Sequence, residues 1–153
     1  MIVYDIEIEK SPKIDKNRPN WDRYRYANGW DDHKGMGVAV IGWFNYDTAE
    51  YGHSLLKDIN KFQAMIKDNL VIGFNNDRFD DAILRAIGLK VDHSYDILKN
   101  MWYGAGLSDE FNFRTHGGFS LDKVYKANIG DNGKSGNGQM HRFFGKMENT
   151  KKS

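Results

Sequence analysis

The chain has 153 residues, of which 40% are hydrophobic and 28% charged, with 22 Lys and Arg against 21 Asp and Glu. This length predicts one domain with a substantial core, and the near-neutral charge identifies no partner by itself. Cysteine is absent, which excludes disulfides and thiolate metal sites and favours a cytoplasmic location. No apolar run approaches the about 18 residues of a membrane span and no signal peptide precedes the first strand, so we expect no membrane partner.

The first predicted element is a strand over residues 1–8, Met-Ile-Val-Tyr-Asp-Ile-Glu-Ile. Side chains alternate along a strand, so Asp5 and Glu7 share one face and the apolar side chains occupy the other. Two carboxylates roughly 6–7 Å apart at Cα repel each other and are costly to bury. A divalent cation such as Mg²⁺ or Mn²⁺ prefers oxygen ligands and would offset both costs. The alternative is an edge strand whose second face is wetted by solvent.

A long loop, a hairpin and a helix are expected next. Residues 9–34 predict a polar loop rich in Trp, Tyr and Arg, in which Asp31-Asp32-His33 is more typical of a surface turn than of a metal site. Residues 37–44 predict a buried strand, and residues 49–53 predict its hairpin partner. Apolar residues then recur at helical spacing, which predicts a helix face packed on a sheet, at Leu55, Ile59, Phe62 and Ile66.

Residues 70–74 predict a short apolar strand of the parallel type, which ends at the turn residue Asn75. A helix is expected to begin near Phe79, and its buried face is expected to include Ile83, Leu84 and Ile87. Asp80 falls in the first turn of this helix and is directed back at the sheet, whereas Asp81 is more typical of a residue that complements the helix dipole. Local sequence alone favours a ligand role and a dipole role equally for Asp80. The order of elements predicts an α/β fold with a mixed sheet and flanking helices.

These residues together resemble a known family. Asp5-Ile-Glu7, and Gly73-Phe-Asn75 followed by Phe79-Asp80, are similar to the first two motifs of the DEDD superfamily of 3′–5′ exonucleases, which share the ribonuclease H-like fold. The spelling Gly-Phe-Asn-x-x-x-Phe-Asp is most similar to the proofreading exonuclease domain of family B DNA polymerases and its stand-alone, often phage-encoded relatives. Ser94-Tyr-Asp-Ile-Leu98 and Phe119-Ser-Leu-Asp-Lys-Val-Tyr125 extend the resemblance, which covers about residues 1–135.

The resemblance implies a ribonuclease H-like domain over residues 1–130 that removes nucleotides from the 3′ end of single-stranded DNA, with RNA as a possible substrate. It implies two Mg²⁺ or Mn²⁺ ions, with Asp5 bridging them, Glu7 holding the ion that activates water and Asp80 holding the ion near the leaving group. Asn75 and Phe79 would contact the substrate strand. A polymerase, another replication protein or a complementary chain is the protein partner implied.

The family's third motif, Tyr-x-x-x-Asp or His-x-x-x-x-Asp, is not found. Tyr125 is followed four residues later by Ile129, and His141 is followed five residues later by Lys146. We therefore expect a chain that is truncated or altered before this motif, with an exposed apolar patch where the missing helix would pack. Residues 131–153 predict a glycine-rich loop and a basic tail, in which Asp131 and Glu148 are weak substitutes for the fourth carboxylate. Lys134 is available to a backbone phosphate.

Two alternatives to an active enzyme remain open from the sequence. One is a nucleic-acid-binding module that keeps the fold and has lost turnover. The other is a fragment of a split exonuclease that needs a partner chain. In each case, the aromatic and arginine-rich segment at residues 21–30 can either stack on unpaired bases or pack on the edge of the sheet.

Overall fold

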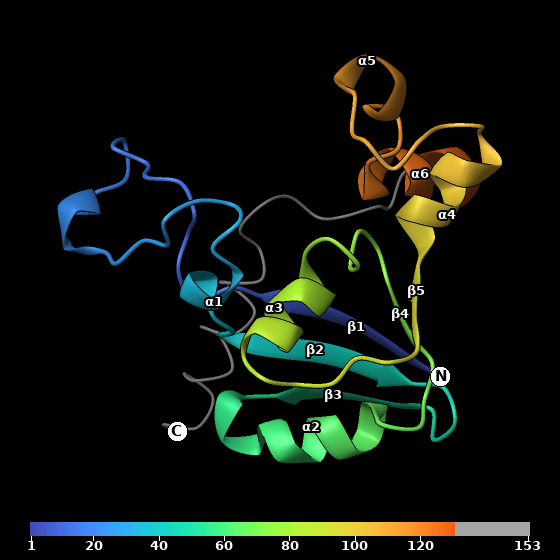
Figure 1. The fold of residues 1–153 in the computed structure, drawn as a ribbon, viewed down its shortest axis with the longest axis horizontal. Coiled ribbons are helices and arrows are strands. Elements are labelled where there is room, and N and C mark those ends of the chain that lie inside the picture. Colours follow the sequence, from blue (N-terminus) through green and yellow to red (C-terminus); the bar gives the residue numbers. More distant parts are fainter. Residues whose placement is uncertain (131–153) are drawn as a thin grey trace. The chain divides into compact units, whose positions relative to one another are not determined.

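The computed structural model describes residues 1–130, and the chain divides into two compact units, Met1–Gly106 and Leu107–Ser153. The first unit contains a five-stranded sheet in the order β3-β2-β1-β4-β5 (Figure 1). β1 pairs antiparallel with β2 and parallel with β4, so it is a central strand rather than an edge strand. The strands are β1 (Ile2–Glu7), β2 (Val40–Asn45), β3 (Glu50–Ser54), β4 (Val71–Gly73) and β5 (Ser94–Asp96).

The helices of this unit lie between the strands in the chain, except α4, which follows β5. They are η1 (Trp21–Arg23), α1 (His33–Met36), η2 (Leu56–Asp58), α2 (Ile59–Ile66), α3 (Asp80–Ala86) and α4 (Ile97–Gly104). The predicted α/β class and mixed sheet are confirmed. The second strand begins three residues later than predicted, because Gly37 has a left-handed backbone (φ 61°) that ends α1 and precludes a regular strand there.

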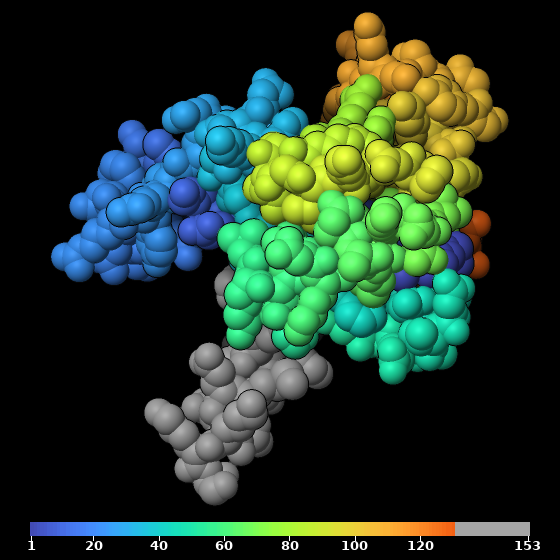
Figure 2. Space-filling model, turned by 60° about the horizontal axis from the view of Figure 1, so that its bottom comes forward, coloured from blue at the N-terminus to red at the C-terminus, as the bar shows by residue number. Residues whose placement is uncertain are grey.

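One face of the sheet carries the core. Ile2, Tyr4 and Ile6 of β1 are buried together with side chains from α1, α2 and α3, and α2 lies beside α3 in the space-filling view (Figure 2). The Tyr4 and Phe62 rings lie 6.1 Å apart. Ile87, predicted on the buried stripe, is only half-buried because α3 ends at Ala86.

The second face of the sheet carries Asp5 and Glu7, which are exposed. One residue pair further along the strands, an apolar row crosses all five strands on this face. Val3 pairs with both Phe44 and Ile72, and these two in turn pair with Tyr51 and Tyr95. Tyr51 is 85% exposed. The two candidate carboxylates therefore lie beside an aromatic surface.

The second unit contains α5 (Phe113–His116) and α6 (Leu121–Asn128). His116 of this unit is buried; it contacts the Ser108 carbonyl through Nε2 at 2.9 Å and accepts the Asn112 amide through Nδ1 at 3.1 Å. These two contacts describe a structural histidine whose ring is fixed by local backbone. No helix within residues 1–130 combines the length and the apolar character that crossing a bilayer requires.

Replacement of Gly73 tests the tight end of β4. An added Cβ at Gly73 would lie 2.6 Å from Cβ of the buried Asn76, so Gly73→Ala is expected to lower the free energy of unfolding by about 1–3 kcal/mol. Gly42→Ala is the matched control, because no atom lies within 4 Å of the added Cβ. Urea denaturation measures both variants, and an equal effect of the two would contradict the close approach at Gly73.

Candidate functional site

The site begins with an open donor on β1. The Ile2 amide donates to the Leu70 carbonyl at 2.8 Å, on the side of β4. Backbone donors alternate along a strand, so the Ile6 amide points to this same side. β4 pairs with β1 only at Ile2 and Val3 and ends at Gly73, which leaves no strand backbone opposite Ile6. A buried amide in this position requires another acceptor.

Asp80 supplies that acceptor. Its Oδ1 accepts the Ile6 amide at 3.2 Å, and its side chain is 5% exposed. Burial, followed by repulsion from Asp5, raises the pKa of Asp80 to about 7. The predicted direction of Asp80, back at the sheet from the first turn of α3, is confirmed. Its carboxylate meets β1 at the residue between Asp5 and Glu7.

The donor set fits a divalent cation in part. Asp5 is near enough to Asp80 to raise its pKa, and such a pair of oxygen ligands gains most from a hard cation. Within residues 1–130, however, no group of three or more His, Asp or Glu side chains converges at metal-binding distance. Of the three predicted carboxylates, Asp5 and Asp80 thus lie close to each other. Glu7 is exposed two residues further along β1.

The loop between β4 and α3 is held by Asp96, at the end of β5. Its Oδ1 accepts the Asn75 amide at 2.9 Å and its Oδ2 accepts the Asp77 amide at 3.1 Å. The same side chain caps α4 by accepting the Lys99 amide at 3.3 Å. Asn75 has a left-handed backbone, φ 61°, which Asn tolerates better than most residues. The predicted turn at Asn75 is therefore fixed by Asp96, but β4 itself ends earlier than predicted, at Gly73.

Asp81 is the residue that sequence reasoning misjudged. It is fully buried instead of complementing the helix dipole at the surface. Its Oδ1 accepts the Tyr4 hydroxyl, and its Oδ2 accepts Asn76 Nδ2 at 3.2 Å and the Ser94 hydroxyl at 2.5 Å. Burial and the neighbouring Asp81 raise the pKa of Tyr4 far above its ordinary range, so the hydroxyl stays a donor. The signal was available, because an inward-facing Tyr needs an acceptor.

Phe79, which directly precedes Asp80 in the chain, belongs to an aromatic pair. Phe79 packs on Trp30 with ring centroids 6.1 Å apart, and Trp30 remains 62% exposed. Phe79 is partly buried against the core, which supports one side of the pair. Trp21 lies further back in the same long loop, which projects from the sheet (Figure 1), and it is 36% exposed with Lys16 5.7 Å from its ring.

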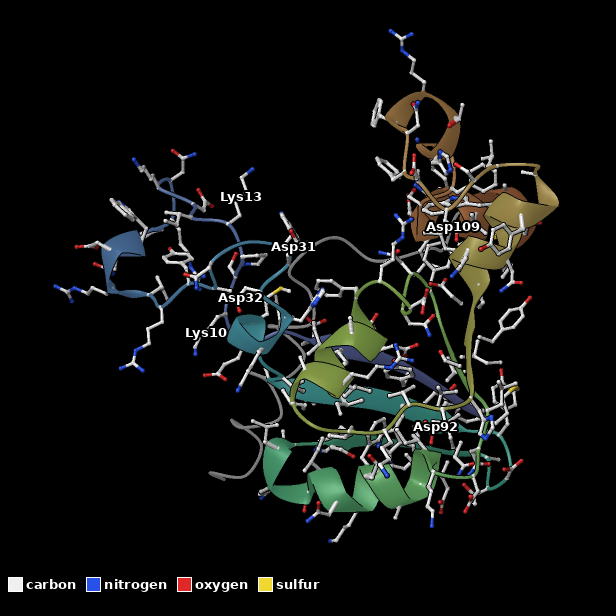
Figure 3. All side chains as sticks on the ribbon, viewed as in Figure 1. Lys10, Lys13, Asp31, Asp32, Asp92 and Asp109 are labelled. Atoms are coloured by element: carbon white, nitrogen blue, oxygen red, sulfur yellow. The ribbon has the colours of Figure 1, made fainter. Side chains whose placement is uncertain are left out.

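The Asp31-Asp32-His33 cluster, predicted as a surface turn, leads directly into α1, which begins at His33. Asp32 caps α1, accepting the Gly35 amide through Oδ1 and the Asn28 amide through Oδ2, each at 2.9 Å. These hydrogen bonds lower the pKa of Asp32. Asp31, Asp32 and Lys10 lie together beside α1, whereas Asp92 lies on the other side of the first unit (Figure 3).

Three residues singled out in the sequence, Asp131, Lys134 and Glu148, lie outside the described residues. The comparisons with known proteins assign no relative, since no protein-family model matches the chain and no curated protein is significantly similar to it.

The raised pKa of Asp80 predicts how stability depends on pH in EDTA. Asp80 binds a proton more tightly in the folded state, so folding is favoured below about pH 4 and loses this contribution as pH rises through about 7. Asp80→Asn keeps an acceptor for Ile6 without the charge. We expect it to raise the free energy of unfolding at pH 8 by on the order of 2–4 kcal/mol and to change little at pH 4.

Chemical denaturation from pH 4 to pH 8 measures this difference, with the exposed Asp92→Asn as the control. A difference between wild type and Asp80→Asn that is the same at both pH values would contradict a buried, protonated Asp80. A destabilisation by Asp80→Asn at pH 8 would contradict it as well.

Proposed function

We propose that this protein is a metal-dependent 3′–5′ exonuclease of ribonuclease H-like fold that acts on the 3′ end of single-stranded nucleic acid. The observation that carries the proposal is the hydrogen bond from the Ile6 amide to Asp80. It brings the acidic residue of the second motif against the strand that bears the first motif, Asp5 and Glu7. The mixed sheet, with β1 between an antiparallel hairpin and two parallel strands, supports the same fold.

Asp5, Glu7 and Asp80 are the residues that would hold Mg²⁺ or Mn²⁺ in this proposal. When bound, the cations lower the pKa of an attacking water and neutralise charge on the phosphate and the leaving oxygen. The water oxygen attacks phosphorus, the bond from phosphorus to the 3′ oxygen breaks, and that oxygen takes a proton. The products are a 5′-mononucleotide and a strand shortened by one nucleotide.

The electrostatics of Asp80 suit this role. Without a cation, burial and Asp5 raise the pKa of its carboxyl to about 7, so a large fraction is protonated near neutral pH. A cation that contacts both residues favours the ionised form, so binding releases a proton. A cation would offset both the burial of Asp80 and its repulsion by the exposed Asp5, which is a reason for such a pair to lie at this position.

The Trp30 and Phe79 pair supports a single strand as the substrate. Base-to-aromatic stacking needs no particular base and needs an unpaired strand, and Phe79 of this pair directly precedes Asp80 in the chain. Asn75, in the loop held by Asp96, is the proposed contact to the sugar-phosphate backbone. The preference for DNA over RNA comes from the resemblance to proofreading domains.

Binding without turnover is the second candidate function. It is favoured by the exposed position of Glu7 and by the lack of a three-carboxylate cluster within the described residues. Loss of one positioning group commonly costs a factor of 10²–10⁴ in rate. The two candidates therefore differ in turnover and agree on metal-dependent recognition of a 3′ end.

A degradation assay tests the proposal. With a 5′-labelled single strand and Mn²⁺, we expect slow, stepwise shortening from the 3′ end, faster than with Mg²⁺, and none for Asp5→Ala. Calorimetric titration with Mn²⁺ is expected to show binding that Asp5→Ala removes, and the exposed Asp92→Ala is the control.

Each outcome separates the candidates. Mn²⁺ binding and tight binding of a free 3′ end without shortening would identify a non-catalytic module. No Mn²⁺ binding by the wild type would refute both. Shortening that survives Asp5→Ala would show that the activity arises elsewhere.

Trp30→Ala tests the stacking contact. In EDTA, where the strand is not degraded, we expect this variant to bind a fluorescent single strand about tenfold more weakly than wild type, since one stacked base contributes on the order of 1–3 kcal/mol. Trp21→Ala, in the same loop, is expected to bind like the wild type. Fluorescence anisotropy measures both, and an equal loss in the two variants would indicate a general effect of the loop.

A further inference from the structure

β1 and α3, which carry the candidate carboxylates, are joined by a second hydrogen bond. Its two residues are the chain neighbours of Asp5 and Asp80. On β1, Tyr4 precedes Asp5, and on α3, Asp81 follows Asp80. The Tyr4 hydroxyl donates to Asp81 Oδ1 on the core face of the sheet. The Asp80 contact to Ile6 lies at the edge that β4 leaves open.

We propose that the Tyr4–Asp81 hydrogen bond positions Asp80 against Asp5, so that Tyr4 and Asp81 are positioning residues of the site. This inference rests on the proposed function for the role of Asp80 as a metal ligand. The hydrogen bonds of Tyr4 and Asp80 supply the geometry. Tyr4 is 4% exposed and Asp81 is fully buried. Bulk water therefore has little access to this bond, and its loss removes a hydrogen bond that joins the first turn of α3 to β1.

The geometry explains why the bond acts on Asp80. Asp80 and Asp81 are consecutive residues in the first turn of α3, and Asp5 lies between Tyr4 and Ile6 on β1. The Tyr4 hydroxyl, bonded to the Asp81 carboxylate, therefore holds the turn that carries Asp80 against the part of β1 that carries Asp5, through a charge-assisted contact.

The chain offers a matched control. Ser94, on β5, donates to the other oxygen of Asp81 at 2.5 Å. Ser94→Ala removes a hydrogen bond to the same buried carboxylate but no link to β1. Tyr4→Phe removes the link and keeps the ring that packs on Phe62 at 6.1 Å. A purely structural role predicts similar effects for the two variants.

Two measurements separate positioning from stability. The first is hydrogen exchange of the Ile6 amide, which reports the Asp80 contact without metal or substrate. We expect Tyr4→Phe to speed this exchange at least tenfold relative to the amides that pair β4 with β5, and Ser94→Ala to leave that ratio unchanged. The second is the Mn²⁺ dissociation constant, which we expect Tyr4→Phe to raise by roughly tenfold, as for other residues that orient metal ligands.

The outcomes are distinct from those that test the exonuclease. If wild type binds no Mn²⁺, the proposed function fails, and the Ile6 exchange ratio still decides whether Tyr4 positions Asp80. An unchanged ratio in Tyr4→Phe, or an equal change in Ser94→Ala, would overturn the inference.

Should Tyr4→Phe not fold, Asp81→Asn replaces it. The oxygen of the introduced amide accepts from Asn76 and Ser94, and its nitrogen donates to the Tyr4 hydroxyl oxygen, so the link to β1 keeps both partners but loses the charge of Asp81. Faster Ile6 exchange relative to the amides that pair β4 with β5 supports positioning by the charge-assisted bond, and an unchanged ratio would overturn it.

Discussion

The hydrogen bond between the Ile6 amide and the Asp80 carboxylate is the contact on which the arrangement of the site depends. It exists because β4 ends at Gly73 while β1 continues for several residues. An amide in the middle of the sheet must be paired, and the partner here is a side chain instead of a strand. A carboxylate is thereby buried beside Asp5, at a cost that only protonation or a cation relieves.

Around this contact, polar residues form a hydrogen-bonded network next to the apolar core. Tyr4, Asn76 and the exposed Ser94 donate to the buried Asp81, and Asp96 holds the loop that leads to α3. Each oxygen of these two carboxylates has a donor, and such networks fix one arrangement of their elements. The loop, the first turn of α3 and the middle of β1 are thus kept in register, which is what a site built from three chain segments requires.

The sequence predicted most of this framework, because its signals are local. Alternation in β1, the spacing of Phe62 and Ile66 in α2 and the turn residue Asn75 each depend on neighbours in the chain. The position of Asp80 was also predictable from the buried stripe of α3. The role of Asp81 was not assigned, since its three partners lie on β1, on β5 and in the loop before α3, and helix-dipole reasoning considers only its own helix. The convergence of Glu7 with the other carboxylates remains a prediction.

Because β4 ends early, its length decides what can occupy the edge of β1 beyond Val3. In a parallel sheet, a strand longer by two or three residues would continue the ladder and occupy the edge of β1 with its own backbone. A side chain from the following helix could then no longer reach that edge. The length of one short strand therefore determines whether the amides of the central strand pair with backbone carbonyls or with an acidic side chain. The residues of the core need not change.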